Sequence, residues 1–584
     1  MQRSFKVLLI KPSHYDDDGY VVQWMRSPIP SNSMACLNGL AQQARRDQAL
    51  GPDVDLDIEA FDETNIRIRP ELLARRIAAA GDGVVMLVGV QSNQFPRALD
   101  IARRFRALGV KVGIGGFHVS GTLAMLPGIE ANVQTALDMG CFLFAGEAEG
   151  GRLDEVLRDA AAGALKPIYN HMDDLPDMAR APTPVLPAEV VARTMDRLSS
   201  FDAGRGCPYQ CSFCTIINVQ GRRSRRRTPD DIEQIVRENA AQGILRFFIT
   251  DDNFARNKDW EAIFDRLIHL REVEEIRIRL TIQVDVLCHR LPGFIRKARR
   301  AGVRWAFIGL ENISPDNLLA AKKRQNKITD YRRMLLQWKQ AGIITYCGYI
   351  TGFPNDTRER LLRDVRTAQE ELPLDLLEFF YLTPLPGSED HQKGVRDGVP
   401  MDPDLNKYDL CHPVVDHPHM SQEEWRRTYL DCWRLYYSKE HMDRVLRRNA
   451  ALGSSLSNLW LLLGWFRGSL FIEGVHPLEC GVARRKYRRD RRPGLPIEPI
   501  WAFYPKFFAE VMVKAWQWGA LFAWLWGRYR AISKDPDARR YLDQAISPMD
   551  DEHEEERPMF QTEEAKAFVV QQHRFEKIKA GAAG

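Results

Sequence analysis

Long apolar runs and a secretory signal are missing from this sequence. No stretch reaches the roughly 18 uninterrupted apolar residues that a helix needs to cross a bilayer, so we expect no transmembrane span. The segment Met1 to Lys6 leads directly into a short apolar strand, without an apolar signal core or a cleavage site. We therefore expect a cytoplasmic protein without a signal peptide.

The sequence also lacks a large excess of charge of one sign and an internal repeat of fixed period. The chain of 584 residues has 82 basic and 78 acidic side chains, which give a formal net charge of +4. This balance argues against a nucleic-acid-binding protein that relies on bulk charge, so we expect no nucleic-acid partner. Apolar residues make up 45% of the chain and charged residues 27%, which is ordinary for a globular protein and excludes wholesale disorder.

Cysteine is scarce outside one short segment. Seven of the ten cysteines stand alone, and without a secretory signal we expect them to be reduced and mostly buried. The other three are Cys207, Cys211 and Cys214, which lie within eight residues. This spacing requires an explanation of its own.

Residues 1–160 alternate strands with helices. The strands expected at 7–10, 54–60, 84–90 and 110–115 are apolar on both faces, and helices are expected at 35–46, 70–80 and 96–108. Such strands predict an α/β unit with a doubly wound parallel sheet covered by helices. Ligands of these sheets bind outside the carboxyl ends of the strands. The loops 89–92, 115–120 and 146–150 lie there.

Three further regions follow. Residues 161–195 carry five prolines and predict an extended linker. Residues 196–390 contain six strands that alternate with helices, which predicts a partial (β/α)6 TIM-like barrel with its active face at the carboxyl ends of the strands. Residues 391–584 predict a helical region, and its acidic block at 550–556 is expected to be a solvated tail.

The three grouped cysteines can act as metal ligands. Thiolates spaced by four and three residues, on a loop after the first barrel strand, can reach three corners of an iron–sulfur cube. Clusters normally take four thiolates, so three would leave one iron open to a substrate or cofactor. The alternatives are three buried thiols, or a zinc site, which as a closed structural site requires a fourth ligand.

The pattern Cys-x-x-x-Cys-x-x-Cys, with Phe213 before the last cysteine, resembles the radical S-adenosylmethionine (SAM) superfamily over roughly residues 195–390. The resemblance implies a 4Fe-4S cluster on the three cysteines, with SAM chelating the fourth iron. Reductive cleavage of SAM would give a 5′-deoxyadenosyl radical that abstracts a hydrogen atom from the substrate. An external electron donor such as a flavodoxin or a ferredoxin is implied as a partner.

Other motifs resemble the cobalamin-dependent branch of this superfamily. Thr250-Asp251-Asp252-Asn253 stands where many relatives have Gly-Gly-Glu, so either Asp251 or Asp252 would bind the SAM amino group. Gln283 occupies a lumen-facing position of the third barrel strand, by the two-residue period of a strand. By the same resemblance Glu311 would bond the ribose, and the segment from Gly348 to Pro354, which includes Gly352, would pack on adenine.

The first unit resembles the cobalamin-binding domain of the same branch. The resemblance rests on Gly115-Gly116-Phe117-His118-Val119-Ser120 and on Gly146-Glu147-Ala148-Glu149. Their glycines let the backbone approach a nucleotide tail closely, and Ser92, His118 and Ser120 could bond its polar groups. A buried, structural His118 is the alternative. The motif Asp-x-His-x-x-Gly is missing, so histidine ligation of cobalt is not implied.

The basic run from Arg222 to Arg227 also allows two interpretations. One is a patch for a nucleic acid or a phosphate. The other, which we favour, is a structural or SAM-carboxylate role for Arg225 and Arg227, which lie where relatives carry basic residues.

Two uncharged segments of the C-terminal region flank a basic run. Residues 454–466 and 515–527 are too short to span a bilayer at about 1.5 Å per residue, and residues 484–492 between them are mostly basic. A helical core beside a solvated charge run is one interpretation. The other is peripheral contact with the inner face of a membrane.

Together these features predict a cobalamin-dependent radical SAM enzyme. The leading hypothesis is methyl transfer to an unactivated carbon of a small, hydrophobic or lipid-like substrate. One alternative is a radical SAM cyclase or other C–C bond-forming enzyme without methyl transfer. A non-catalytic cobalamin sensor is the alternative of another class.

Overall fold

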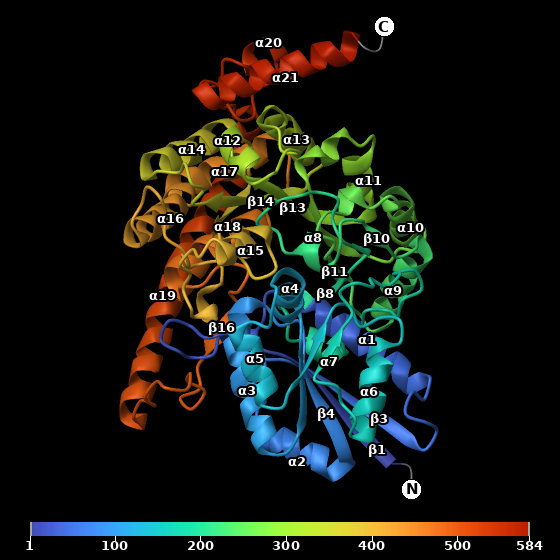
Figure 1. Cartoon of the computed structure of the whole chain (residues 1–584). Helices are drawn as coiled ribbons and strands as arrows, with labels where there is room; N and C mark the ends of the chain where they lie inside the picture. The colour runs from blue at the N-terminus through green and yellow to red at the C-terminus, as the bar shows by residue number, and fades with distance from the viewer. Residues whose placement is uncertain (1–2, 582–584) are drawn as a thin grey trace.

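The computed structural model describes residues 3–581 and contains two six-stranded parallel sheets, one below the other, with a helical region beside them (Figure 1). This α/β architecture with a helical C-terminal region confirms the expected fold class. Among the helices of residues 3–581, none is long and apolar enough to cross a membrane.

The N-terminal sheet has the strand order β3-β1-β4-β5-β6-β7. Its last strand lies inside the segment expected to be a linker, where it extends the sheet by pairing with β6. The strands are β1 (Arg3–Lys11), β3 (Val54–Asp62), β4 (Gly81–Leu87), β5 (Lys111–Gly115), β6 (Phe142–Ala145) and β7 (Ile168–Asn170).

Helices cover both faces of this sheet because its strands are apolar on both faces. Leu9 of β1 packs into the cluster that contains α1 and α6, whereas Ile10 packs into the cluster that contains α2 and α3. The helices of this unit are α1 (Asn32–Arg46), α2 (Pro70–Ala80), α3 (Phe95–Ala107), α4 (Phe117–Met125), α5 (Ala131–Asp138) and α6 (Arg152–Ala162).

The second sheet is an open, barrel-like sheet with the order β15-β14-β13-β12-β11-β8. All six strands lie where the sequence predicts strands, namely β8 (Leu198–Phe201), β11 (Arg246–Ile249), β12 (Arg279–Val284), β13 (Val303–Glu311), β14 (Ile344–Thr351) and β15 (Leu376–Tyr381). The larger helices around it are α9 (Pro229–Ala241), α10 (Trp260–Glu272), α11 (Phe294–Ala301), α12 (Pro315–Ala320), α13 (Ile328–Gln340) and α14 (Arg358–Glu371).

The two sheets belong to one continuous body. A single hydrophobic cluster contains side chains of α1 and α6 together with Phe201 and Ala203 at the end of β8. The proline-rich segment crosses α1 at Gly39, where a Cβ atom would overlap the carbonyl of Thr183. The short strand β2 (Gln23–Arg26) pairs with β16 (Val482–Arg485), which joins the first unit to the C-terminal region.

The C-terminal region is helical, as expected. Trp425 and Trp433 of α16 are fully buried against the barrel, and Leu459 and Leu463 of α18 are buried in the same cluster. The first uncharged segment is therefore part of the core. The helices are α15 (Glu389–Arg396), α16 (Gln422–Tyr436), α17 (Lys439–Ala451), α18 (Leu459–Gly468), α19 (Ile500–Lys534), α20 (Asp551–Glu554) and α21 (Glu563–Gly581).

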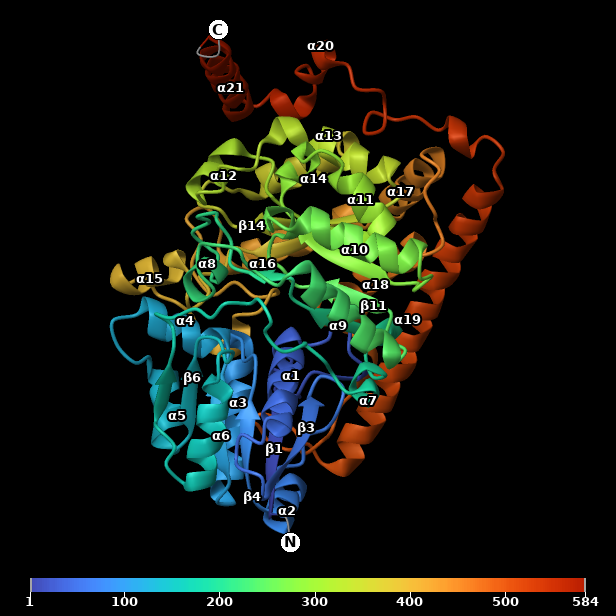
Figure 2. The ribbon, with the colours of Figure 1, turned by 90° about the vertical axis from the view of Figure 1, so that its right-hand side faces the viewer.

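Two features of this region differ from expectation. The second uncharged segment is only part of α19, a 35-residue helix that runs along one side of the molecule past both sheets (Figure 2). The acidic block is not wholly solvated, because the Glu554 carboxylate lies 2.6 Å from the Arg332 guanidinium and 3.1 Å from that of Arg557. The ion pair with Arg332 of α13, 222 residues earlier in the chain, is a contact that the sequence pattern does not reveal, and it accounts for this correction.

Candidate functional site

The three grouped cysteines follow the short strand β9 (Gly204–Arg205) at the carboxyl end of the barrel sheet. All three are free thiols, and Cys211 is buried. Burial raises the pKa of the Cys207 thiol to about 11 and that of Cys214 to about 12. A nearby cation such as iron is what would convert such thiols into thiolate ligands.

The cysteine loop is held in place by Asp285. The Tyr209 hydroxyl, between the first two cysteines, donates a hydrogen bond of 2.7 Å to the Asp285 carboxylate. The Arg256 guanidinium donates to both oxygens of that carboxylate, at 2.6 and 2.8 Å. Asp285, which directly follows β12, thus positions the loop, and Gln283 of β12 donates a long hydrogen bond of 3.4 Å to the Asp251 carbonyl.

Asp251 and Asp252 have different surroundings. One Asp251 oxygen accepts hydrogen bonds from the backbone N–H groups of Ala203 (2.6 Å) and Gly204 (2.9 Å), so this carboxylate fixes the chain just before the cysteines. Asp252 lies close enough to Cys207 and Cys214 for its charge to raise the pKa of both thiols. Burial raises the pKa of each of the two carboxyl groups to about 7.

Glu311 ends the fourth barrel strand in a left-handed conformation, with φ of 65°. Such backbone strain is typical of functional positions. Its carboxylate forms an ion pair with Lys323, whose Nζ atom also lies 5.8 Å from the centre of the Phe213 ring in the cysteine loop. Lys323 was not expected at the site from the sequence. The basic triplet at 322–324, soon after a barrel strand, is the only signal for it.

The two glycines expected near adenine differ in role. A Cβ atom on Gly348 of β14 would lie 3.1 Å from Phe380 and 3.2 Å from Phe307, so the position packs closely against two aromatic rings. Gly352 has φ of 97°, and a Cβ atom there would overlap the Trp425 ring of α16. Its N–H donates to Asp356 at 2.9 Å, so Gly352 serves the turn after the strand.

Glu378 lies beside Gly348 in the neighbouring strand β15 and was not identified from the sequence. Its side chain is fully buried, and both carboxylate oxygens lack a hydrogen-bond partner among the described residues. Burial alone raises the pKa of Glu378 to about 8, so the group is mainly protonated at neutral pH. A single acid in the apolar run Leu-Leu-Glu-Phe-Phe-Tyr is its only sequence signal.

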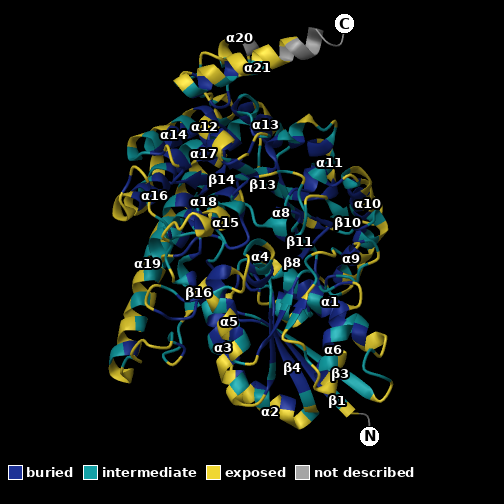
Figure 3. Ribbon diagram, viewed as in Figure 1, coloured by how far each residue is buried: buried dark blue, intermediate teal, exposed yellow. Residues whose placement is uncertain are grey.

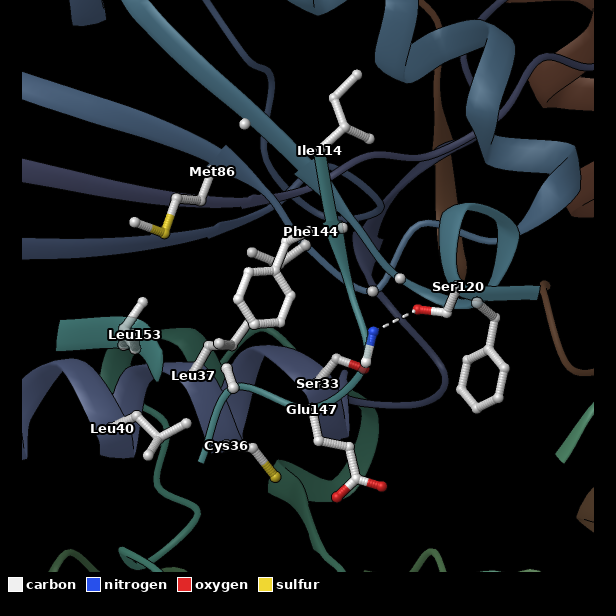
Figure 4. A pocket seen from close by; sticks show the side chains of 18 of the residues that line it. Ser33, Cys36, Leu37, Leu40, Met86, Ile114, Ser120, Phe144, Glu147 and Leu153 are labelled. Carbon is white, nitrogen blue, oxygen red and sulfur yellow. Dashed lines mark hydrogen bonds between the residues drawn. The ribbon is translucent and has the colours of Figure 1, made fainter. Parts of the chain in front are cut away.

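A cavity of about 160 Å³ lies at the carboxyl ends of β4, β5 and β6 (Figure 4). Predicted residues that line it are Gly115, Gly116, Ser120, Gly146 and Glu147. Gly116 has φ of 145°, and a Cβ atom there would overlap the Val90 backbone, so only glycine fits. The Ser120 hydroxyl accepts a hydrogen bond of 3.1 Å from the Gly146 N–H, which ties the two glycine loops together (Figure 4).

Ser92 and His118 lie outside the lining of this cavity. His118 is fully buried, its Nδ1 atom lies 3.1 Å from the Ser92 hydroxyl, and its ring centre is 4.3 Å from that of Phe95. Burial lowers the pKa of His118 to about 3, so the ring is neutral. This geometry matches the structural alternative for His118.

Charged groups join the cavity to the cysteine loop. Arg205, two residues before Cys207, lies 2.9 Å from Glu147 and 2.7 Å from Glu149 of the third glycine loop. Arg225 pairs with Glu147 as well and donates to the Pro176 carbonyl at 2.7 Å. Arg205 itself lines the cavity. Arg227 donates to the Asp202 and Ala181 carbonyls, so both arginines bind groups of this chain.

The residues present fit both expected groups. Three glycines, Gly115, Gly116 and Gly146, line the cavity without a side chain, as close approach of a nucleotide tail to the backbone requires. The three thiols lie on one loop, and soft thiolates are the ligands of iron–sulfur clusters. Within residues 3–581 no group of three or more His, Cys, Asp or Glu side chains is gathered as a single metal ion requires.

Comparison with known proteins agrees with this geometry. Residues 202–368 match the family model of the radical SAM superfamily. Bacteriochlorophyllide d C-8(2)-methyltransferase of Chlorobaculum tepidum is 26% identical, over 62% of this chain and 81% of that protein. Hopanoid C-2 methylase of Rhodopseudomonas palustris is 27% identical, over 56% of this chain and 61% of that protein. The protein is an enzyme with a radical SAM domain.

Two solved structures share the fold of this chain. The methyltransferase TsrM from Kitasatospora setae, solved with tryptophan substrate and a SAM analogue, has a TM-score of 0.55 and 16% identity, over 74% of this chain and 89% of TsrM. The cobalamin-dependent SAM radical enzyme OxsB, solved with aqua-cobalamin and SAM, has a TM-score of 0.54 and 12% identity, over 97% of this chain and 83% of OxsB.

Proposed function

We propose that this radical SAM enzyme is a cobalamin-dependent methyltransferase that methylates an unactivated carbon of a hydrophobic, lipid-like small molecule. The observation that carries the proposal is the shared wall of the glycine-lined cavity. Residues of the first unit line it together with Arg205, Val219 and Gln220, which flank the cysteines. A group bound in this cavity would therefore lie beside the cysteine loop.

The proposal gives each part of the site a task. Cys207, Cys211 and Cys214 hold the 4Fe-4S cluster, which with SAM supplies radical chemistry, while cobalamin supplies methyl transfer. Asp252 accepts the SAM amino group, because the Asp251 carboxylate already accepts two backbone hydrogen bonds. Glu311, held by Lys323, accepts from the ribose, and Gly348 admits the adenine. Gly115, Gly116, Ser120, Gly146 and Glu147 line the nucleotide-tail pocket, with Ser92 and His118 behind them.

A hydrophobic substrate is supported by the residues near the barrel mouth. Ile350 near the end of β14 and Phe353 just after it belong to a buried cluster, and Phe213 of the cysteine loop packs against this cluster with Phe380 and Leu382. Apolar walls of this kind suit an apolar molecule and exclude water. Relatives named for hopanoid and bacteriochlorophyllide methylation support the same substrate class.

The proposal also includes partners and location. A flavodoxin or ferredoxin would supply the electrons that SAM cleavage consumes. We place the protein in the cytoplasm with peripheral contact on the inner membrane face, where a lipid-like substrate is found.

A comparison of metabolites tests the proposed function. The lipid fraction of a strain that lacks the gene is compared with that of its parent by mass spectrometry. We expect the deletion to remove at least one lipid and to accumulate a precursor that is lighter by one methylene unit. Accumulation of a precursor that differs by hydrogen loss or ring closure would contradict methyl transfer and favour the cyclase alternative, a reaction for which other relatives are named.

A further inference from the structure

The long helix α19 exposes apolar side chains to solvent over most of its length. Trp501 is 79% exposed, Trp516 is 74% exposed and Phe508 is 67% exposed, values that are unusual for large aromatic residues. Together with Tyr504, Met512 and Trp526 they form what we call the α19 face. In Figure 3 the N-terminal half of α19 is largely coloured as exposed, at the edge of the molecule.

The α19 face is one side of the helix. At 3.6 residues per turn its six members fall within an arc of roughly 120°. Phe503, Leu525 and Ile532 lie on another side, where they are buried against the body of the protein. Packing onto α18 therefore uses a separate stripe, and the α19 face is left without cover among the described residues.

The charges near this face have one sign. Within the described range 482–534 every exposed charged residue is basic: Arg485, Arg489, Lys506, Arg530 and Lys534. The acidic residues of the range are not exposed, and they pair with cations. Glu510 pairs with Lys486 at 3.2 Å and with Lys514 at 2.7 Å, and Glu498 lies 3.5 Å from Lys506.

An apolar aromatic stripe with a basic border fits the surface of a bilayer. Trp and Tyr place an apolar body among acyl chains and a polar tip among headgroups, and basic side chains attract anionic headgroups. Residues 500–527 extend about 42 Å as a helix, and no described helix is apolar enough to span a membrane. A helix of this kind lies in the plane of the interface.

We propose that the α19 face is the surface by which this protein docks onto anionic lipid bilayers. The role of this surface rests on the proposed function, since docking would bring the protein to a lipid-like substrate. Its physical basis is separate from methyl transfer, because binding to a bilayer requires neither SAM nor substrate.

Vesicle sedimentation tests this surface with the full-length protein. The probes are vesicles of phosphatidylglycerol with phosphatidylcholine, and vesicles of phosphatidylcholine alone. We expect binding to the anionic vesicles that weakens as salt is raised. The variant Trp501→Glu/Phe508→Glu/Trp516→Glu should bind them about tenfold or more weakly, because three aromatic side chains lose their burial in lipid.

Two further variants complete the experiment. Val273→Glu changes an apolar residue that is 66% exposed at the end of α10, on the opposite side of the molecule from α19 in Figure 1, and should bind like the unmodified protein. Arg485→Glu/Arg489→Glu should lose the preference for anionic vesicles. Equal binding of all variants would overturn the proposal.

A dimer in solution that the triple variant disrupts, with no vesicle binding by the unmodified protein, would also overturn it and would assign the face to a second copy of the chain. Methyl transfer to a detergent-solubilised lipid extract is measured in parallel. If the triple variant no longer binds vesicles but still methylates the extract, the docking surface and the methyltransferase function are separate properties. Failure of one proposal can then be distinguished from failure of the other.

Discussion

The Nη1 atom of Arg205 lies 2.9 Å from the Oε2 atom of Glu147, and both side chains are buried. This ion pair joins the segment just before the cysteines to the loop that closes the glycine-lined cavity. Asp202 and Glu149 each add a contact of 2.7 Å to the same guanidinium. Arg205 therefore fixes the position of the cysteine loop relative to the glycine-lined cavity.

Removal of the Arg205 side chain should lower the stability of the folded protein. In Arg205→Ala three buried carboxylates lose a shared cation, and breaking a buried ion pair from one side costs roughly 3–5 kcal/mol. We expect a clear fall in the thermal midpoint of unfolding, measured by circular dichroism. The matched control Arg45→Ala removes an exposed pair with Asp55 and should change stability by less than about 1 kcal/mol. Similar midpoints for the two variants would contradict the role of Arg205.

Asp252 should bind SAM directly. Asp252→Asn removes a charge from the proposed amino-group site, so we expect SAM affinity in the reconstituted protein to fall about tenfold or more, with iron content unchanged. Equilibrium dialysis gives the affinity. Asp251→Asn should instead reduce iron retention and thermal stability, because the Ala203 and Gly204 N–H groups lose a charged acceptor. Unchanged SAM affinity in Asp252→Asn would assign the amino group elsewhere.

Glu378 should make stability fall as pH rises. Its folded pKa of about 8 exceeds the ordinary value of 4.5, so the folded state holds a proton that the unfolded state releases. The stabilisation is complete below about pH 4.5 and is lost, at about 1.4 kcal/mol per pH unit, as pH rises toward 8. Glu378→Gln does not titrate. Relative to the unmodified protein its thermal midpoint should therefore rise between pH 5 and pH 8, and a pH-independent difference would contradict the buried proton.

The three cysteines should hold the cluster as a set. Cys211→Ala should retain far less iron and sulfide after anaerobic reconstitution, and should form no 5′-deoxyadenosine. Cys141→Ala, which changes a buried free thiol of the first unit, should keep the iron content of the unmodified protein. If the unmodified protein retained no iron and sulfide, the cluster assignment would fail altogether.

Much of the fold could be predicted from local patterns. The strands β4 and β14 are apolar runs flanked by turn residues, and their existence depends on composition alone. The pairing of β2 with β16 could not be predicted, because it joins segments more than 450 residues apart that carry no strand pattern. The exposed face of α19 was also hidden, since a sequence does not show which side of an apolar helix meets the protein.

The site shows the same division. The cysteines and glycine loops are short motifs whose chemistry is local, and the structure brings Gly116 and Ser120 to one cavity. Lys323 and Glu378 could not be recognised in the same way, because their significance depends on which buried groups the fold places beside them. His118 was predicted to bind a ligand because a histidine side chain can form hydrogen bonds to polar groups. In the structure its ring is buried, and burial lowers its pKa so that the ring is neutral.

Transfer of label from methyl-labelled SAM tests the central claim most directly. The protein is reconstituted anaerobically with iron, sulfide and cobalamin, and incubated with a reductant, the labelled SAM and a lipid extract from a strain that lacks the gene. We predict 5′-deoxyadenosine together with label in a single lipid product, and neither with Cys211→Ala. Formation of 5′-deoxyadenosine and a changed lipid that carries no label would contradict the account.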